Sequence, residues 1–123
     1  MAQVTGVGGI FFKARDPKAL SAWYAQHLGF KIEQFGGAQF YDDNARPGFT
    51  LWSPFKQDTK YFEPGTKDFM INFRVDDLHA LLAQLRAAGV EVDAKVDESE
   101  YGRFGWIIDP DGNRVELWEP PPK

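Results

Sequence analysis

The chain carries one order of elements twice, and this internal repeat constrains its fold more than any other feature. Residues 49–54 (FTLWSP) match residues 115–120 (VELWEP), and residues 12–16 (FKARD) match residues 73–77 (FRVDD). Self-similarity of this kind is the sequence signature of duplicated structural units. We therefore expect a single domain over residues 1–123, with a first module at 1–54, a connecting loop at 55–68 and a second module at 69–123.

The first module reads as a strand, a helix and three short strands. The apolar run at 4–14 predicts the opening strand. Asp16 and Pro17 then begin a helix that ends at Gly29, because Asp caps helix N-termini and Pro is tolerated at the first helical position. Strands are expected near 30–35, 38–42 and 48–53, separated by turns at 36–37 and 43–47.

The second module repeats this order. Asp76 or Asp77 caps a helix that ends at Gly89, and its apolar stripe consists of Leu78, Leu81, Leu82, Leu85 and Ala88. Strands are expected at 69–75, 90–96, 104–108 and 114–119, and the DPDGN sequence at 109–113 predicts a tight turn.

The composition excludes several classes of function. The chain has no cysteine, which removes disulfides, thiolate nucleophiles and Cys-ligated metals. Its formal net charge of −4 disfavours general nucleic-acid binding, which needs a basic face. No apolar run approaches the roughly 20 residues of a membrane span, and residues 1–9 lack the pattern of a secretory signal. We expect a cytoplasmic protein with neither a nucleic acid nor a membrane as partner.

Strand alternation separates a helix-covered face from a second face in each module. If the two modules curl toward each other, the second faces line a common hollow. Rings mixed with a few polar groups are typical of small-molecule sites, and the expected wall has this mixture: Gly9, Phe11, Lys13, Thr50, Trp52, Met70, Asn72, Arg74, Arg114, Glu116 and Trp118. Two alternatives stay open, a half-solvated sheet face and a structural ion pair between Glu116 and Arg74 or Arg114.

Three glycines near the start of the chain and two connecting segments also bear on the hollow. The glycines at 6, 8 and 9 indicate close strand packing or a hollow too tight for side chains. Residues 54–68 and 98–105 both carry aromatic rings, so each is interpreted as a lid or binding edge, or equally as a dimer contact.

Two segments resemble the vicinal oxygen chelate superfamily, which includes glyoxalase I, extradiol dioxygenases, fosfomycin-resistance enzymes and bleomycin-resistance proteins. These are residues 12–16 followed by Trp23-Tyr24 and His27-Leu28-Gly29-Phe30, and the closing DPDGNRVEL at 109–117. The resemblance implies an α+β fold in which two tandem βαβββ modules form a cupped mixed sheet with helices on its outer face, completed as a homodimer.

The resemblance also implies four inward positions that hold a divalent metal in the enzymes. They fall on Gly9, Thr50, Met70 and Glu116 in this chain. Glycine has no donor atom, thioethers are poor partners for hard cations, and a threonine hydroxyl is a weak ligand. Only Glu116 is a usual ligand, so we expect no metal and no other cofactor.

The leading hypothesis is a protein that binds a small anionic or aromatic molecule without a metal. Trp52, Trp118 and Phe11 would stack on it, Arg74 with Lys13 or Arg114 would pair with an anionic group, and Glu116 would accept hydrogen bonds or act as a base. One alternative is a metal-dependent lyase or isomerase of the glyoxalase kind with Glu116 as base or ligand. Another is a protein-interaction module whose hollow is closed by its own side chains.

Overall fold

The computed structural model describes residues 2–28, 30–41, 48–109 and 112–122. The elements are, in chain order, β1 (Val4–Ala14), α1 (Pro17–Leu28), β2 (Ala38–Phe40), β3 (Thr50–Lys56), β4 (Phe69–Val75), α2 (Leu78–Ala87), β5 (Glu91–Ser99), β6 (Gly102–Ile108) and β7 (Arg114–Glu119). The expected turn at 43–47, and residues 110–111 of the expected turn at 109–113, lie outside the described residues.

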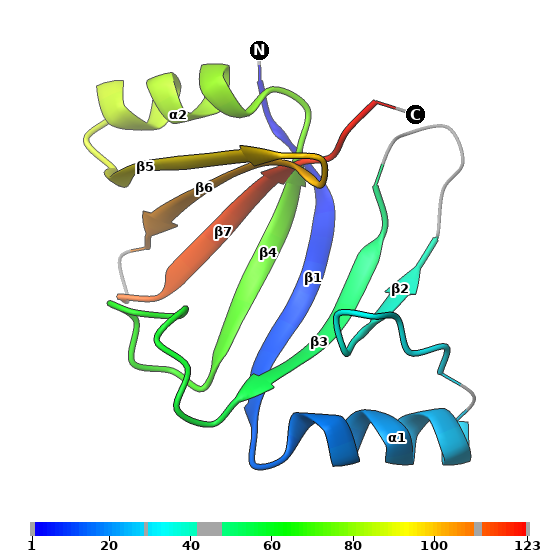
Figure 1. Ribbon diagram of the computed structural model, residues 1–123. Helices are drawn as coiled ribbons and strands as arrows, with labels where there is room; N and C mark the ends of the chain where they lie inside the picture. Colours follow the sequence, from blue (N-terminus) through cyan, green and yellow to red (C-terminus); the bar gives the residue numbers. More distant parts are fainter. Residues whose placement is uncertain (1, 29, 42–47, 110–111, 123) are drawn as a thin grey trace.

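Within this part of the chain, seven strands form one mixed sheet in the order β2-β3-β1-β4-β7-β6-β5. β1 and β4 pair antiparallel at its centre, and each also pairs in parallel with the last strand of its own module, β3 or β7. The same pairing in both halves agrees with the duplicated pattern of the sequence. Figure 1 shows the sheet curling from β3 round to β5 with α1 and α2 outside it, so the predicted α+β fold with a cupped mixed sheet is confirmed.

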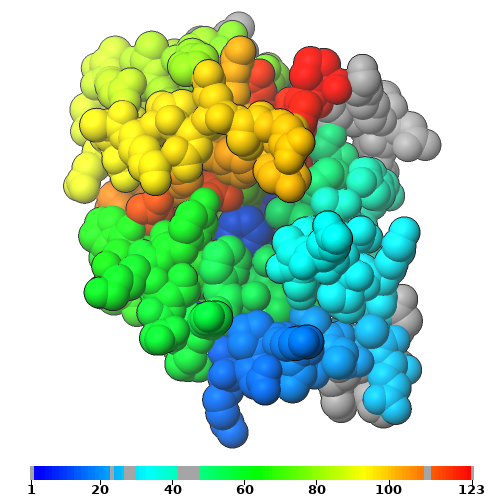
Figure 2. Space-filling view, in the orientation of Figure 1, coloured from blue at the N-terminus to red at the C-terminus, as the bar shows by residue number. Residues whose placement is uncertain are grey.

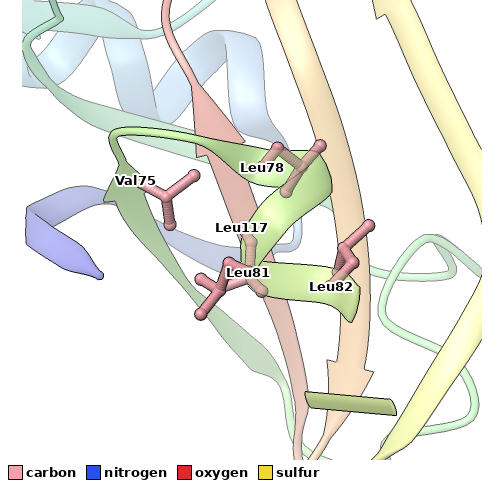
Figure 3. Packing of buried hydrophobic residues seen from close by; sticks show 5 residues of the cluster. All are labelled: Val75, Leu78, Leu81, Leu82 and Leu117. Atoms are coloured by element: carbon pink, nitrogen blue, oxygen red, sulfur yellow. The ribbon is translucent and has the colours of Figure 1, made fainter. Parts of the chain in front are cut away.

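The second helix packs on the outer face through the predicted leucine stripe. Its N-cap is Asp77, whose carboxylate accepts a hydrogen bond from the Ala80 N–H at 3.1 Å. Leu78, Leu81 and Leu82 are buried against Val75 and Leu117 (Figure 3). Complete burial of a leucine contributes roughly 1.5–3 kcal/mol, so this cluster fixes α2 over β4 and β7.

Two expected elements differ from the structure. Residues 30–35 form no strand, because the chain folds back at Glu33, whose N–H donates to the Gly37 carbonyl at 2.8 Å and whose carbonyl accepts from the Gly36 N–H at 3.0 Å. The expected loop at 98–105 is mostly strand, because β5 continues to Ser99 and β6 begins at Gly102. Among the residues that the structure describes, the first module therefore has one strand fewer than the second, and the β5–β6 hairpin is longer than predicted.

Neither α1 nor α2, within the residues that the structure describes, combines the length and the apolar character needed to cross a membrane.

Candidate functional site

The concave face of the sheet brings together most of the side chains predicted to line the hollow. Phe11, Met70 and Trp118 are buried there with Asn72 and Glu116. Phe11 and Met70 pack with Phe62 and Trp106 in one apolar cluster. These side chains come from β1, β4, β6, β7 and the segment after β3, so strands from both modules build this face.

The orientation expected for β3 is wrong. Gly9 lies beside Leu51 and Ile10 beside Trp52 in the parallel pair of β1 and β3. Trp52 consequently faces α1, where its ring centroid lies 4.5 Å from that of Tyr24 and 5.0 Å from that of Phe30. By alternation Thr50 shares this outer orientation, and the side chains on the concave face are those of Phe49, Leu51 and Phe55.

A bulge in β1 explains the run of glycines. The pairing of β1 with β4 shifts between Val7 and Gly9. A Cβ added at Gly8 would lie only 1.8 Å from the Asn72 side-chain oxygen. The prediction of a space too tight for side chains is therefore confirmed at Gly8, which gives Asn72 room to reach Glu116.

Glu116 is the centre of a buried hydrogen-bond network. Its Oε1 accepts from the Asn72 amide at 2.6 Å, and its Oε2 accepts from the Tyr61 hydroxyl at 2.5 Å and from the Trp106 indole at 2.9 Å. Burial raises the pKa of the Glu116 carboxyl, and the three donors oppose this rise only in part. Burial together with the neighbouring Glu116 charge raises the pKa of the Tyr61 hydroxyl.

The alternative of a structural ion pair between Glu116 and Arg74 or Arg114 is not what the structure has, because three uncharged donors surround the carboxylate. Arg114 instead lies over the Trp106 ring, 4.8 Å from its centroid, and donates to the Glu63 carbonyl at 2.6 Å. Lys13 lies near Asp68, with 3.7 Å between their charged atoms. Arg74 lies along Gly6, where an added Cβ would come within 3.0 Å of its Nη2.

The donors at the four family positions do not fit a divalent cation. Gly9 offers no side chain, Thr50 faces away, and the Met70 thioether is buried among rings. Both oxygens of Glu116 already accept hydrogen bonds. Among the residues that the structure describes, no three His, Cys, Asp or Glu side chains gather where they could hold a metal ion.

The segment after β3 closes the middle of the concave face. Phe62 is 2% exposed and packs on Phe55 with ring centroids 5.0 Å apart, while Tyr61 stacks on the same Phe55. Tyr61 and Trp106 were absent from the predicted site. The ring-rich segment at 54–68 pointed to Tyr61, and alternation along β6 would have placed Trp106 on the inner face.

The rest of the concave face stays open as a pocket of about 730 Å³. Five rings and two aliphatic side chains line it together with three polar residues: Phe35, Phe49, Tyr101, Phe104 and Trp118; Leu51 and Pro121; Glu33, Gln34 and Glu100. Figure 2 shows the surface hollowed between the tip of the β5–β6 hairpin (amber) and the segment around residues 31–37 (cyan). Of the predicted wall, only Trp118 lines this pocket.

A second pocket of similar size, about 720 Å³, lies along α1, between that helix and residues 32–36. One ring, Phe35, lines it beside charged residues such as Asp16, Lys18 and Lys56. We take the concave pocket as the candidate site because rings with few polar groups are the usual lining of a small-molecule site.

Two duplicated modules in one curved sheet, with a buried carboxylate on the concave side, define the class: this is the architecture of the glyoxalase, bleomycin-resistance and dioxygenase (vicinal oxygen chelate) superfamily. Residues 9–118 match the family model described as a glyoxalase-like domain, and the chain belongs to this family. No curated protein gives a significant match.

Several solved structures share the fold. Methylmalonyl-CoA epimerase from Mycobacterium tuberculosis is 22% identical with a TM-score of 0.65, over 97% of this chain and 90% of that one. Streptomyces coelicolor methylmalonyl-CoA epimerase in complex with 2-nitronate-propionyl-CoA is 20% identical with a TM-score of 0.72, over 96% and 99%. A glyoxalase/bleomycin resistance protein/dioxygenase superfamily member from Vibrio splendidus is 12% identical with a TM-score of 0.57, over 97% and 99%.

Proposed function

We propose that this protein binds a small planar aromatic molecule in the concave pocket and does not use Glu116 as a metal ligand. The observation that carries the proposal is the pocket of about 730 Å³ with its five aromatic rings. Sites of roughly 300–1,000 Å³ with an apolar, ring-rich lining are typical for small organic ligands.

The rings divide into a fixed base and exposed walls. Trp118 is 3% exposed, its indole N–H donates to the Tyr101 carbonyl at 2.8 Å, and its ring stacks on Phe104 at an interplanar angle of 10°. Phe35 is 52% exposed and Tyr101 is 68% exposed. In our proposal Trp118 supports the pocket from beneath, while Phe35 and Tyr101 contact the ligand from the sides.

Two other functions have less support. A metal-dependent lyase or isomerase would need donors that the four family positions do not provide. A pure interaction module with a closed hollow fits the middle of the concave face, which Tyr61 and Phe62 cover. It does not explain the pocket that remains open beside them.

Ligand titration tests the proposal. Naphthylmethanol, a neutral planar probe, is added while intrinsic fluorescence or amide chemical shifts are recorded. We expect saturable binding that weakens about tenfold in Phe35→Ala and Tyr101→Ala, since each truncation removes a stacking face. Phe40→Ala is the matched control, because this ring is 44% exposed but does not line the pocket and packs on Phe30 instead. Absence of saturable binding, or equal weakening in the control, would overturn the proposal.

The expected homodimer is also proposed, through the outer face of β1 and β4. Val7, Ile10 and Phe69 are 43%, 48% and 48% exposed there. Ile10 lies opposite Ile71, and the outward positions beside them are apolar, so two copies can meet on this face without like-charge repulsion. Light scattering is expected to give a dimer for the wild type and a monomer for Ile10→Glu, whereas a monomeric wild type would contradict the proposal. A cytoplasmic location stays a prediction from the sequence.

A further inference from the structure

The charged residues of the concave pocket are all acidic. Glu33 and Glu100 contribute the ionisable side chains of its lining, and no Lys, Arg or His is among the described residues that line it. This differs from the anionic ligand expected from the sequence, which relied on arginine and lysine side chains at the hollow.

Glu33 lies in the wall of the pocket. It is half-buried, and its backbone is fixed in the turn by hydrogen bonds with Gly36 and Gly37. Among the described residues its carboxylate makes no ion pair. A carboxylate beside apolar rings is stabilised when a positive charge or hydrogen-bond donors are brought to it.

Basic side chains of the concave face are engaged elsewhere. Arg114 donates to the Glu63 carbonyl and covers the rings of Tyr61 and Trp106. Lys13 lies 3.7 Å from an Asp68 oxygen at the far end of β1. Lys95 lies near Asp97 and Arg74 lies along Gly6. None of these four basic residues lines the pocket that carries the two carboxylates.

The aromatic rings of the pocket also favour a positively charged ligand. A ring carries negative potential on its face and attracts a cation lying within about 6 Å of its centroid. The exposed rings of Phe35 and Tyr101 lie in the two segments that carry the carboxylates, residues 33–35 and 100–101. Each wall of the pocket therefore presents one ring and one carboxylate.

From this arrangement we infer that the pocket selects an organic cation, a molecule with an aromatic ring and a nearby ammonium group. The inference rests on the proposed function and specifies its ligand class. The ring of the ligand lies between Phe35 and Tyr101, and its ammonium group lies toward Glu33, with Glu100 adding a weaker, solvent-screened attraction.

Three probes of one shape test the charge preference. Naphthylmethylammonium, naphthylmethanol and naphthoate carry a positive, a neutral and a negative substituent on the same ring. We expect the cation to bind about tenfold more tightly than the alcohol and the anion to bind most weakly, with the cation's advantage shrinking at high salt. If naphthoate or the alcohol binds as tightly as the cation, the inference is wrong while the proposed function stands. If none of the three binds, both fail.

Isosteric variants then assign the preference to particular carboxylates. Glu33→Gln is expected to reduce the cation-to-alcohol affinity ratio to about threefold, and Glu100→Gln to reduce it less, because Glu100 is exposed. Glu91→Gln removes an exposed carboxylate from β5 outside this pocket and should leave the ratio unchanged. The cation-to-alcohol affinity ratio is measured within one variant. Partial unfolding weakens the binding of both ligands equally and leaves this ratio unchanged, whereas loss of charge selection lowers it. An unchanged ratio in Glu33→Gln would overturn the inference.

Discussion

The buried carboxyl of Glu116 should make the protein less stable as the pH rises above the acid range. Burial raises the pKa of Glu116 above its ordinary value of 4.5, against the opposing effect of its three hydrogen-bond donors. A carboxyl with a higher pKa in the folded than in the unfolded chain holds its proton more tightly when folded. Its contribution to stability is therefore complete below the unfolded pKa and is lost as the pH rises through the folded one.

Glu116→Gln removes this titration and keeps the shape of the protonated side chain. Because one proton is involved, the difference in unfolding free energy between wild type and variant should change by up to about 1.4 kcal/mol per pH unit. The change begins near pH 4.5 and continues up to the raised pKa. Urea unfolding followed by tryptophan fluorescence at closely spaced pH values gives both curves. The advantage of the wild type should be largest in acid and shrink as the pH rises.

Other carboxyls do not produce this effect. Asp76 and Glu98 are exposed and have lowered pKa values, the first through a backbone hydrogen bond from Gln3 and the second through a hydrogen bond from His79. The stability that these two carboxyls contribute is lost only as the pH falls below their ordinary pKa values, which is a lower pH range than the one in which Glu116 titrates. Tyr61→Phe is the second variant, because it removes one donor but retains the buried carboxyl, and its curve should keep the slope. Parallel curves for wild type and Glu116→Gln above pH 4.5 would refute the reasoning.

Three further outcomes follow from the packing and the donor chemistry. Gly8→Ala should lower the unfolding free energy by about 2 kcal/mol, since its Cβ would lie 1.8 Å from the Asn72 oxygen; Gly6→Ala meets only the end of a flexible side chain and should cost less, and equal losses in urea unfolding would contradict this. Trp52→Ala should cost about 3 kcal/mol through lost packing on α1 yet leave naphthylmethanol binding to the folded protein unchanged in the same titration. Protein incubated with zinc or manganese and then dialysed should retain no equimolar metal by elemental analysis, and metal that Glu116→Gln abolishes would contradict the donor argument.

The fold was largely predictable from the sequence because its signals are local. Asp16-Pro17 and Asp77 mark where the helices begin, and the leucines of α2 follow the helical period. The duplicated pattern predicted the order of the elements, and the resemblance to the superfamily implied the cupped mixed sheet. The strand expected at 30–35 was wrong because the turn begins earlier than its two glycines suggest: Gly36 and Gly37 indicate a turn, but not that it already starts at Glu33.

The site was predicted in part, and the failures share a cause. Inner and outer residues of β4 and β7 followed simple alternation, and Asn72, Glu116 and Trp118 lie where expected. In β3 the resemblance of residues 49–54 to residues 115–120 suggested that Trp52 and Trp118 are equivalent, but the pairing with β1 turns them to opposite faces. A sequence motif fixes spacing, whereas the face of a strand depends on its register with a neighbour.

The role predicted for the arginine and lysine side chains was also wrong. Arginine and lysine residues were assigned to a ligand because they share strands with the rings, but their long side chains find partners within the protein. Arg114 reaches the Glu63 carbonyl in the segment after β3, a contact between distant residues that no local pattern indicates. Phe35 was missed for a similar reason, since it comes from a turn, whereas Tyr101 and Phe104 lie in segment 98–105, which the sequence indicated as a lid, a binding edge or a dimer contact.

The unequal halves of the duplication have a consequence for how the pocket can vary. In the second module the chain after the helix forms β5, which pairs with β6. A change in the backbone of β5 would therefore disturb the hydrogen bonds between these two strands. In the first module the corresponding stretch, residues 30–35, is not part of the sheet, and its residues Glu33 and Phe35 line the pocket. Insertions or substitutions there can reshape the mouth of the pocket while every rung between strands stays in place. The second module thus preserves the sheet, whereas the first module can change the ligand specificity of the pocket.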